Sequence, residues 1–117
     1  EMETAFHSEY RADAVIDHKT AYDRAVRLMH SAEAAAFDLS KAPPGDRARY
    51  GAGKFGDGVL MARRLVETGV PFVEVSLGGW DTHQDNWTKV KANSEQVDAA
   101  MSALLTDLKD RGLLDST

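Results

Sequence analysis

The strongest signal for the fold lies in Val70-Pro71-Phe72-Val73-Glu74-Val75-Ser76-Leu77-Gly78-Gly79-Trp80-Asp81-Thr82-His83-Gln84-Asp85-Asn86. Its first part is rich in β-branched and aromatic residues, with Val73, Val75 and Leu77 on one face, which predicts a β-strand over 71–77. Two glycines then open a loop, and helical spacing returns beyond Asn86. The stretch therefore predicts a strand, a loop and a helix in succession.

Helical patterns flank this stretch on both sides. Apolar residues recur every three or four positions over 20–39, 59–66 and 90–108, which predicts amphipathic helices there, and a weaker pattern over 1–17 predicts another. Gly69 and Gly112 stand where C-terminal caps are expected.

Breaks in these patterns predict where helices stop. Pro43-Pro44-Gly45 ends the 20–39 helix, and one further turn is expected over 47–50. Asn93-Ser94 is expected to divide the last helix in two. A second strand is expected near Leu113, and alternating helices and strands favour an α/β protein with a parallel sheet.

Composition excludes several classes of protein and site. The chain has 117 residues, no cysteine and a net charge of -5, which rules out disulfides and thiolate metal sites. Acidic and basic residues are interleaved without a basic stripe, so we expect no nucleic-acid partner. The apolar runs are too short for a membrane span.

The loop after the predicted strand is the candidate site, because ligands of open α/β sheets bind beyond the carboxyl ends of the strands. Asp81 and His83 offer a carboxylate and an imidazole to a divalent metal. Gly78 and Gly79 shape the loop. Residues expected to support the ligands are Trp80, Asp85 and Asn86.

A purely structural interpretation of the loop stays open. In it, Asp81 caps a turn or the following helix through backbone N–H groups, while His83 packs on Trp80 or Trp87.

Two other motifs are weaker. The glycines over 51–58 lack the spacing of a phosphate-binding loop, and Arg63 and Arg64 are most typical of a solvated helix face. No Gly-x-Ser-x-Gly motif occurs, so the nucleophile of any hydrolase would lie elsewhere.

Several stretches resemble the domain-of-unknown-function 1501 family, sulfatase-like proteins grouped with the alkaline phosphatase superfamily. The most specific are Gly78-Gly79-Trp80-Asp81-Thr82-His83 and Ala62-Arg63-Arg64-Leu65-Val66-Glu67. The others lie at 37–41, 49–51, 55–56, 68–70, 72–75, 84–86 and 104–117. The resemblance covers about Phe37 to Thr117.

The resemblance implies a fold and an activity. It implies a fragment of an alkaline-phosphatase-like three-layer α/β fold, mostly helical here, with one or two parallel strands. It implies a metal-dependent hydrolase of phosphate or sulfate esters, with Asp81 and His83 as ligands of zinc, calcium or manganese. The alternative is a non-catalytic binding or cell-surface assembly protein that keeps the fold.

The same resemblance bears on organisation and location. We expect one partial domain over 1–117, with a helical segment over 1–42 as a cap or insertion and an αβα unit over 43–117. The remainder of the domain would be its partner, and the fragment alone would be inactive and bind metal weakly. Export of the parent protein is implied, since relatives often carry a twin-arginine signal.

Overall fold

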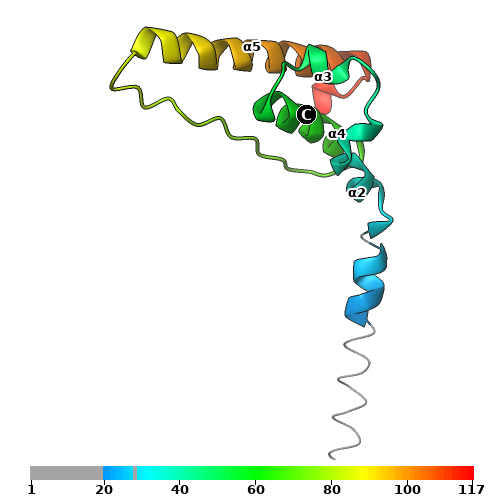
Figure 1. Cartoon of the computed structure of the whole chain (residues 1–117). Coiled ribbons are helices and arrows are strands. Elements are labelled where there is room, and N and C mark those ends of the chain that lie inside the picture. Colours follow the sequence, from blue (N-terminus) through cyan, green and yellow to red (C-terminus); the bar gives the residue numbers. More distant parts are fainter. Residues whose placement is uncertain (1–19, 28) are drawn as a thin grey trace, which may run out of the picture. The chain divides into compact units, whose positions relative to one another are not determined.

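The computed structural model describes residues 20–27 and 29–117 (Figure 1). Residues 20–27 and 29 are helical. The elements after them are the helices α2 (Ala32–Phe37), α3 (Asp46–Arg49), α4 (Lys54–Glu67) and α5 (Asn86–Asp110) and the 3-10 turns η1 (Leu39–Lys41) and η2 (Leu114–Ser116).

Contacts divide the chain into two compact units, residues 1–35 and 36–117. The helix predicted over 1–17 lies outside the described residues. Whether the segment up to residue 42 is a cap or an insertion stays a prediction. The candidate loop belongs to the second unit.

The prediction of an α/β three-layer fold is wrong for the described part of the chain, which holds helices and 3-10 turns but no strand. Residues 72–82 form an irregular segment instead of a strand over 71–77, and a 3-10 turn replaces the strand expected near Leu113. The physical reason is that a strand needs ladder hydrogen bonds from a neighbouring strand, and none of the described residues pairs with this segment as a strand.

The side chains of this segment nevertheless alternate between half-buried and exposed, as the sequence pattern predicts. Val73, Val75 and Leu77 are half-buried, whereas Phe72 and Glu74 are exposed. Val75 packs against the core of the unit, where a Cβ on Gly58 of α4 would lie 3.2 Å from its Cγ1. The apolar face therefore docks on helices without forming a sheet.

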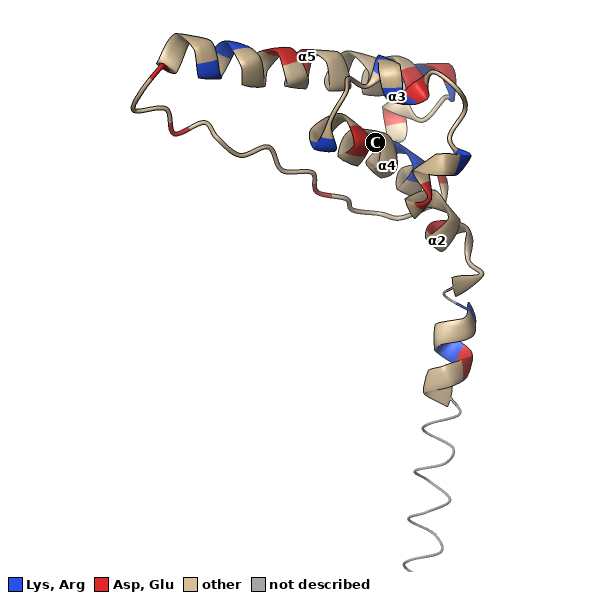
Figure 2. Cartoon of the chain, in the orientation of Figure 1, with Lys and Arg blue, Asp and Glu red and all other residues tan. Residues whose placement is uncertain are grey.

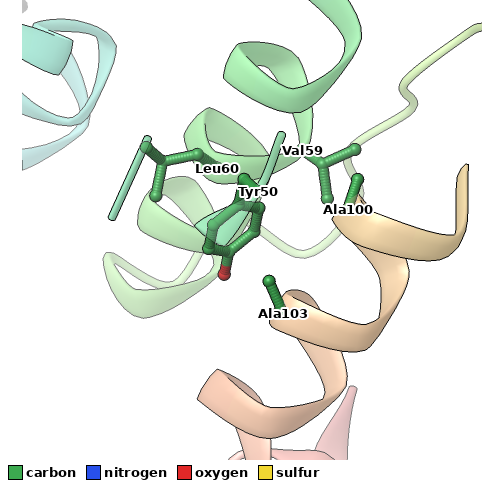
Figure 3. Close-up of a cluster of buried hydrophobic side chains, with 5 residues drawn as sticks. All are labelled: Tyr50, Val59, Leu60, Ala100 and Ala103. Atoms are coloured by element: carbon green, nitrogen blue, oxygen red, sulfur yellow. The ribbon is translucent and has the colours of Figure 1, made fainter. Parts of the chain in front are cut away.

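The core lies between α4 and α5. Figure 3 shows the Tyr50 ring among Val59 and Leu60 of α4 and Ala100 and Ala103 of α5. Tyr50, Leu60 and Ala100 are fully buried. The alanines let α5 come close to α4, because small side chains reduce the separation of packed helices.

Gly56 permits a second close approach. A Cβ at this position would overlap the carbonyl oxygens of Tyr50 and Gly51, so the first turn of α4 lies directly against the chain that precedes it.

Glycines end both long helices as predicted. Gly69 (φ +91°) and Gly112 (φ +67°) are left-handed, and the N–H of Leu113 donates to the carbonyl of Leu108 at 2.8 Å. Such left-handed caps satisfy carbonyls that lack a partner further along the helix.

Two predicted helix boundaries are wrong. The helix expected over 20–39 is interrupted at 30–31, where the Ser31 hydroxyl accepts a hydrogen bond from the Ala34 N–H at 3.1 Å and begins α2 as an N-cap. The expected break at Asn93-Ser94 does not occur, since α5 is continuous.

A buried ionic network joins α3, α4 and α5. The Arg63 guanidinium is 3% exposed and donates to Asp46 Oδ2 at 2.8 Å and to both Glu67 oxygens at 2.9 Å. Its Nε lies 3.4 Å from Asp107 Oδ2. The prediction of a solvated face is thus wrong for Arg63, because its neighbours across the helix interface are carboxylates.

Asp107 is the acceptor at the other side of the network. It is 2% exposed and accepts from the Tyr50 hydroxyl at 2.9 Å and from Arg49 Nη2 at 2.7 Å. Arg111 Nη1 lies 3.6 Å from the same carboxylate. Burial alone would raise the pKa of Asp107, but hydrogen bonds from Arg49 and Tyr50 and the nearby positive charges outweigh it and lower the pKa.

The pKa of the Tyr50 hydroxyl shifts upward, opposite to that of Asp107. Burial first, and then the hydrogen bond to Asp107 and its negative charge, raise the pKa of Tyr50 to about 12. A phenolate here would face a carboxylate in a buried site, so the neutral form is favoured.

We predict that Gly56→Ala destabilises the protein by about 1–3 kcal/mol, because the added Cβ forces the backbone of α4 away from Tyr50 and Gly51. Gly58→Ala is the matched control in the same helix, since its Cβ meets only the Val75 side chain and alanine is the better helix former. Urea unfolding followed by circular dichroism measures both. Equal stability of the two variants would contradict the close approach.

We predict that Tyr50→Phe lowers stability at pH 8 by about 1–3 kcal/mol, because the buried Asp107 carboxylate loses a donor. Because the pKa of Tyr50 is raised in the folded state, its contribution to the free energy of unfolding is fully present below the ordinary pKa of 10.0. That contribution is lost as the pH rises toward about 12. The difference between wild type and variant should therefore narrow from pH 10 to 12.

The control for this pH dependence is Tyr22→Phe, since Tyr22 is 65% exposed. Urea midpoints of this variant should follow those of the wild type across the same pH range. A constant difference between wild type and Tyr50→Phe would show that the Tyr50 proton is not linked to folding.

Candidate functional site

The candidate site lies where the irregular segment meets the start of α5. Asn93 of α5 donates from Nδ2 to the carbonyl oxygen of Gly79 at 3.0 Å and lies 3.4 Å from that of Gly78. Gly79 adopts φ +85°, a conformation that other L-residues rarely take. Gly79 therefore takes a turn conformation that suits glycine, and Asn93 anchors the loop to the helix. That Gly78 and Gly79 shape a ligand loop stays a prediction.

Asp81 and His83 are brought together. His83 Nε2 lies 2.8 Å from Asp81 Oδ1, and the two side chains are 87% and 84% exposed. The Asp81 carboxylate is directed to His83, and both side chains are accessible to solvent. The choice between a metal-ligand role and a purely structural role stays open.

The three neighbours expected to support a metal are placed differently. Trp80 is 45% exposed, and Asn86 accepts from the Thr82 hydroxyl, a bond that closes the loop between them. Asp85 precedes α5 in a left-handed conformation (φ 55°), and its side chain makes no capping hydrogen bond. Within the described residues, none of these three forms a hydrogen bond or ion pair with Asp81 or His83.

The charge of the segment favours a cation. Between Arg64 and Lys89 the chain carries Glu67, Glu74, Asp81 and Asp85 but no Lys or Arg. Figure 2 shows acidic residues and no basic ones along the irregular segment that joins α4 to α5. A local excess of carboxylates raises the concentration of cations near the loop.

The donor set fits a divalent metal in kind but not in number. Zinc takes imidazole nitrogen and carboxylate oxygen at about 2.0–2.2 Å, and the exposed Asp81 and His83 side chains have room to separate around such an ion. Across residues 20–27 and 29–117, however, no group of three His, Asp or Glu side chains is placed to hold a metal. A complete site needs further ligands.

Two contacts differ from what the sequence predicts. The sequence predicts a helix break at Asn93, yet Asn93 lies within α5 and fixes the loop. An Asn inside a helix is itself a signal, because such residues are unfavourable there unless their side chain has another role. The sequence predicts a solvated Arg64, but its Nε donates to the Ala36 carbonyl at 3.0 Å, a backbone contact that residue type does not reveal.

No helix in the part of the chain that the structure covers is long and apolar enough to cross a membrane.

Comparison with known proteins gives one finding. The family described as "Protein of unknown function (DUF1501)" matches residues 1–117. No curated protein and no solved structure matches the chain.

We predict that Asn93→Ala loosens the loop while leaving the fold intact, because it removes the side-chain donor to Gly79. Hydrogen exchange of the amides over 78–83 should become faster, and global stability should fall by no more than about 1 kcal/mol. Gln96→Ala is the control, since Gln96 bonds only within its own helix. Unchanged exchange in Asn93→Ala would show that the bond does not hold the loop.

Proposed function

The chain belongs to the DUF1501 family of proteins of unknown function, and we propose that it supplies Asp81 and His83 to a divalent-metal site of a phosphate or sulfate ester hydrolase. The observation that carries this proposal is the 2.8 Å approach of His83 Nε2 to Asp81 Oδ1 on an exposed loop. Family membership gives no activity, so the proposal rests on this pair and on the resemblance of its motif.

The anchoring of the loop supports a ligand role. A metal ligand must be held in a fixed orientation, and groups outside the coordination sphere do this in most sites. Here Asn93 holds Gly79, two residues before Asp81, and the Thr82–Asn86 bond closes the turn after it. The ligands therefore stand on a loop restrained on both sides.

The donor types narrow the choice of metal. One imidazole and one carboxylate suit zinc or manganese better than calcium, which prefers oxygen ligands alone. Two protein ligands are fewer than the three usual in catalytic sites. Binding by Asp81 and His83 alone should therefore be weak, and the further ligands must come from outside the described residues.

In the proposed reaction a bound metal supplies Lewis-acid stabilisation of the ester oxygens. The role of this chain in the proposal is to hold the metal cation in place. Asp81 brings a negative charge, His83 a neutral nitrogen donor, and the absence of Lys and Arg from 65–88 avoids repulsion of the cation. The nucleophile is not assigned.

A non-catalytic binding role is the second candidate, and exposed aromatic residues favour it. Trp87 is 89% exposed and Phe72 is 79% exposed, so most of each ring is accessible to a partner. Phe72 also borders an apolar hollow of about 240 Å³ between α4 and α5. In this role the Asp81–His83 pair would only shape the loop.

We predict that the protein binds Zn²⁺ or Mn²⁺ through this pair, and that Asp81→Asn and His83→Ala each weaken binding by at least about tenfold, the scale of losing a group that holds a metal. Isothermal titration with each metal measures the affinity. Matched controls are Asp98→Asn and His30→Ala, which remove the same groups at exposed positions elsewhere.

The titrations use the full-length protein, which carries the further ligands. Equal affinity in all four variants, or no binding by the full-length wild type, would refute the metal site. Hydrolysis of p-nitrophenyl phosphate and p-nitrophenyl sulfate, with and without the metal, then separates the two candidates. The absence of both metal binding at this pair and hydrolysis by the full-length protein would favour the binding role.

A further inference from the structure

A hollow of about 240 Å³ is bordered by α4, α5 and the start of the irregular segment. Its lining is largely apolar and includes Val66 of α4, Leu104 and Leu108 of α5, and Pro71 and Phe72 of the segment. Three separate elements therefore form its walls. A cavity of about 150 Å³ with apolar walls holds a benzene molecule, so this hollow has room for one substituted ring.

The same hollow is lined by Arg63, which carries an unsatisfied donor. Among the described residues, Arg63 Nε is the only buried side-chain nitrogen or oxygen without a hydrogen-bond partner. It lies 3.4 Å from Asp107 Oδ2 but makes no hydrogen bond with it. A buried donor without an acceptor is costly, and it indicates a partner that the protein chain does not supply.

The surroundings of Arg63 select a neutral acceptor. The guanidinium already faces the carboxylates of Asp46, Glu67 and Asp107, and a ligand carboxylate would add a like charge beside them. A lone water is also a poor partner, because a buried water needs about two to four polar partners. Besides Arg63, the only polar side chain on the lining is that of Thr117, and its hydroxyl already donates to a backbone carbonyl.

We propose that this hollow binds a small neutral organic molecule with one apolar ring and one carbonyl oxygen, and that Arg63 Nε donates to that oxygen. The ring packs against Leu104, Leu108 and Phe72, since ligand sites are mostly apolar with a few polar groups that fix orientation. The carbonyl supplies the acceptor that Arg63 lacks without adding a charge.

The hollow is distinct from the candidate metal loop. Leu108 and Asn86 stand near opposite ends of α5, roughly 30 Å apart at 1.5 Å per residue. The loop with Asp81 and His83 precedes Asn86. Failure of the metal site would therefore leave this proposal intact, and the reverse also holds.

Titration of the full-length protein with acetophenone, followed by NMR, tests the proposal. Acetophenone carries the ring and the carbonyl, and it should move the Arg63 Nε–H resonance downfield and shift the Leu108 methyl resonances. The dissociation constant should be about 1 mM or lower, as expected for a ligand of this size. Ethylbenzene, which lacks the carbonyl, should shift the Leu108 methyls without the downfield change at Arg63. Benzoate should bind at least tenfold more weakly than acetophenone.

Two variants test the position of the ligand. Ala62→Leu places a larger side chain on the lining of the hollow and should weaken acetophenone binding at least tenfold, whereas Ala92→Leu, at an exposed position of α5, should not. Phe72→Ala removes an exposed ring from the wall and keeps the test informative if Ala62→Leu does not fold. It should weaken binding about fivefold or more, and Phe37→Ala is its control, since Phe37 is also exposed but does not line the hollow.

Three results overturn the proposal. One is the absence of acetophenone binding, which includes the case in which another part of the full-length protein fills the hollow. The second is binding that leaves the Arg63 Nε–H resonance unmoved. The third is equal affinity in wild type, Ala62→Leu and Phe72→Ala.

Discussion

The second unit depends on a guanidinium that is enclosed by carboxylates. Arg63 is as buried as the apolar core, and an unpaired charge there would cost several kcal/mol. Asp46, Glu67 and Asp107 surround it. Because these partners come from α3, α4 and α5, the charge is balanced only when the three helices are assembled together.

The ionic network complements a small apolar core. Apolar contacts between α4 and α5 involve small side chains such as Ala100 and Ala103. Each of these buries little apolar area and does little to fix how far one helix is shifted along the other. The hydrogen bonds of Tyr50 and Arg49 to Asp107 are directional and permit one register. The apolar contacts bring the helices together, and the ionic contacts determine how they are aligned.

Alignment of α5 in turn places the candidate site. Asn93 holds Gly79 because Asp107, about four turns further along the same helix, fixes the position of α5. The sequence predicted Asp81 and His83 as ligands of one metal, and that role stays a prediction. The structure brings the two side chains to 2.8 Å. Asn93 could not be found in the same way, because its contact joins residues 14 positions apart.

The sequence by itself determined the features that depend on neighbouring residues. Gly69 and Gly112 end their helices, Pro43-Pro44 precedes a fresh turn, and the alternation over 73–77 appears in burial, since each follows from local backbone geometry. Only the tertiary structure decided that this alternating segment docks on helices rather than in a sheet, and that Arg63 is buried while its neighbour Arg64 bonds a carbonyl. Strand pairing and charge burial both require groups distant in the chain, and the energy of those contacts exceeds any local preference.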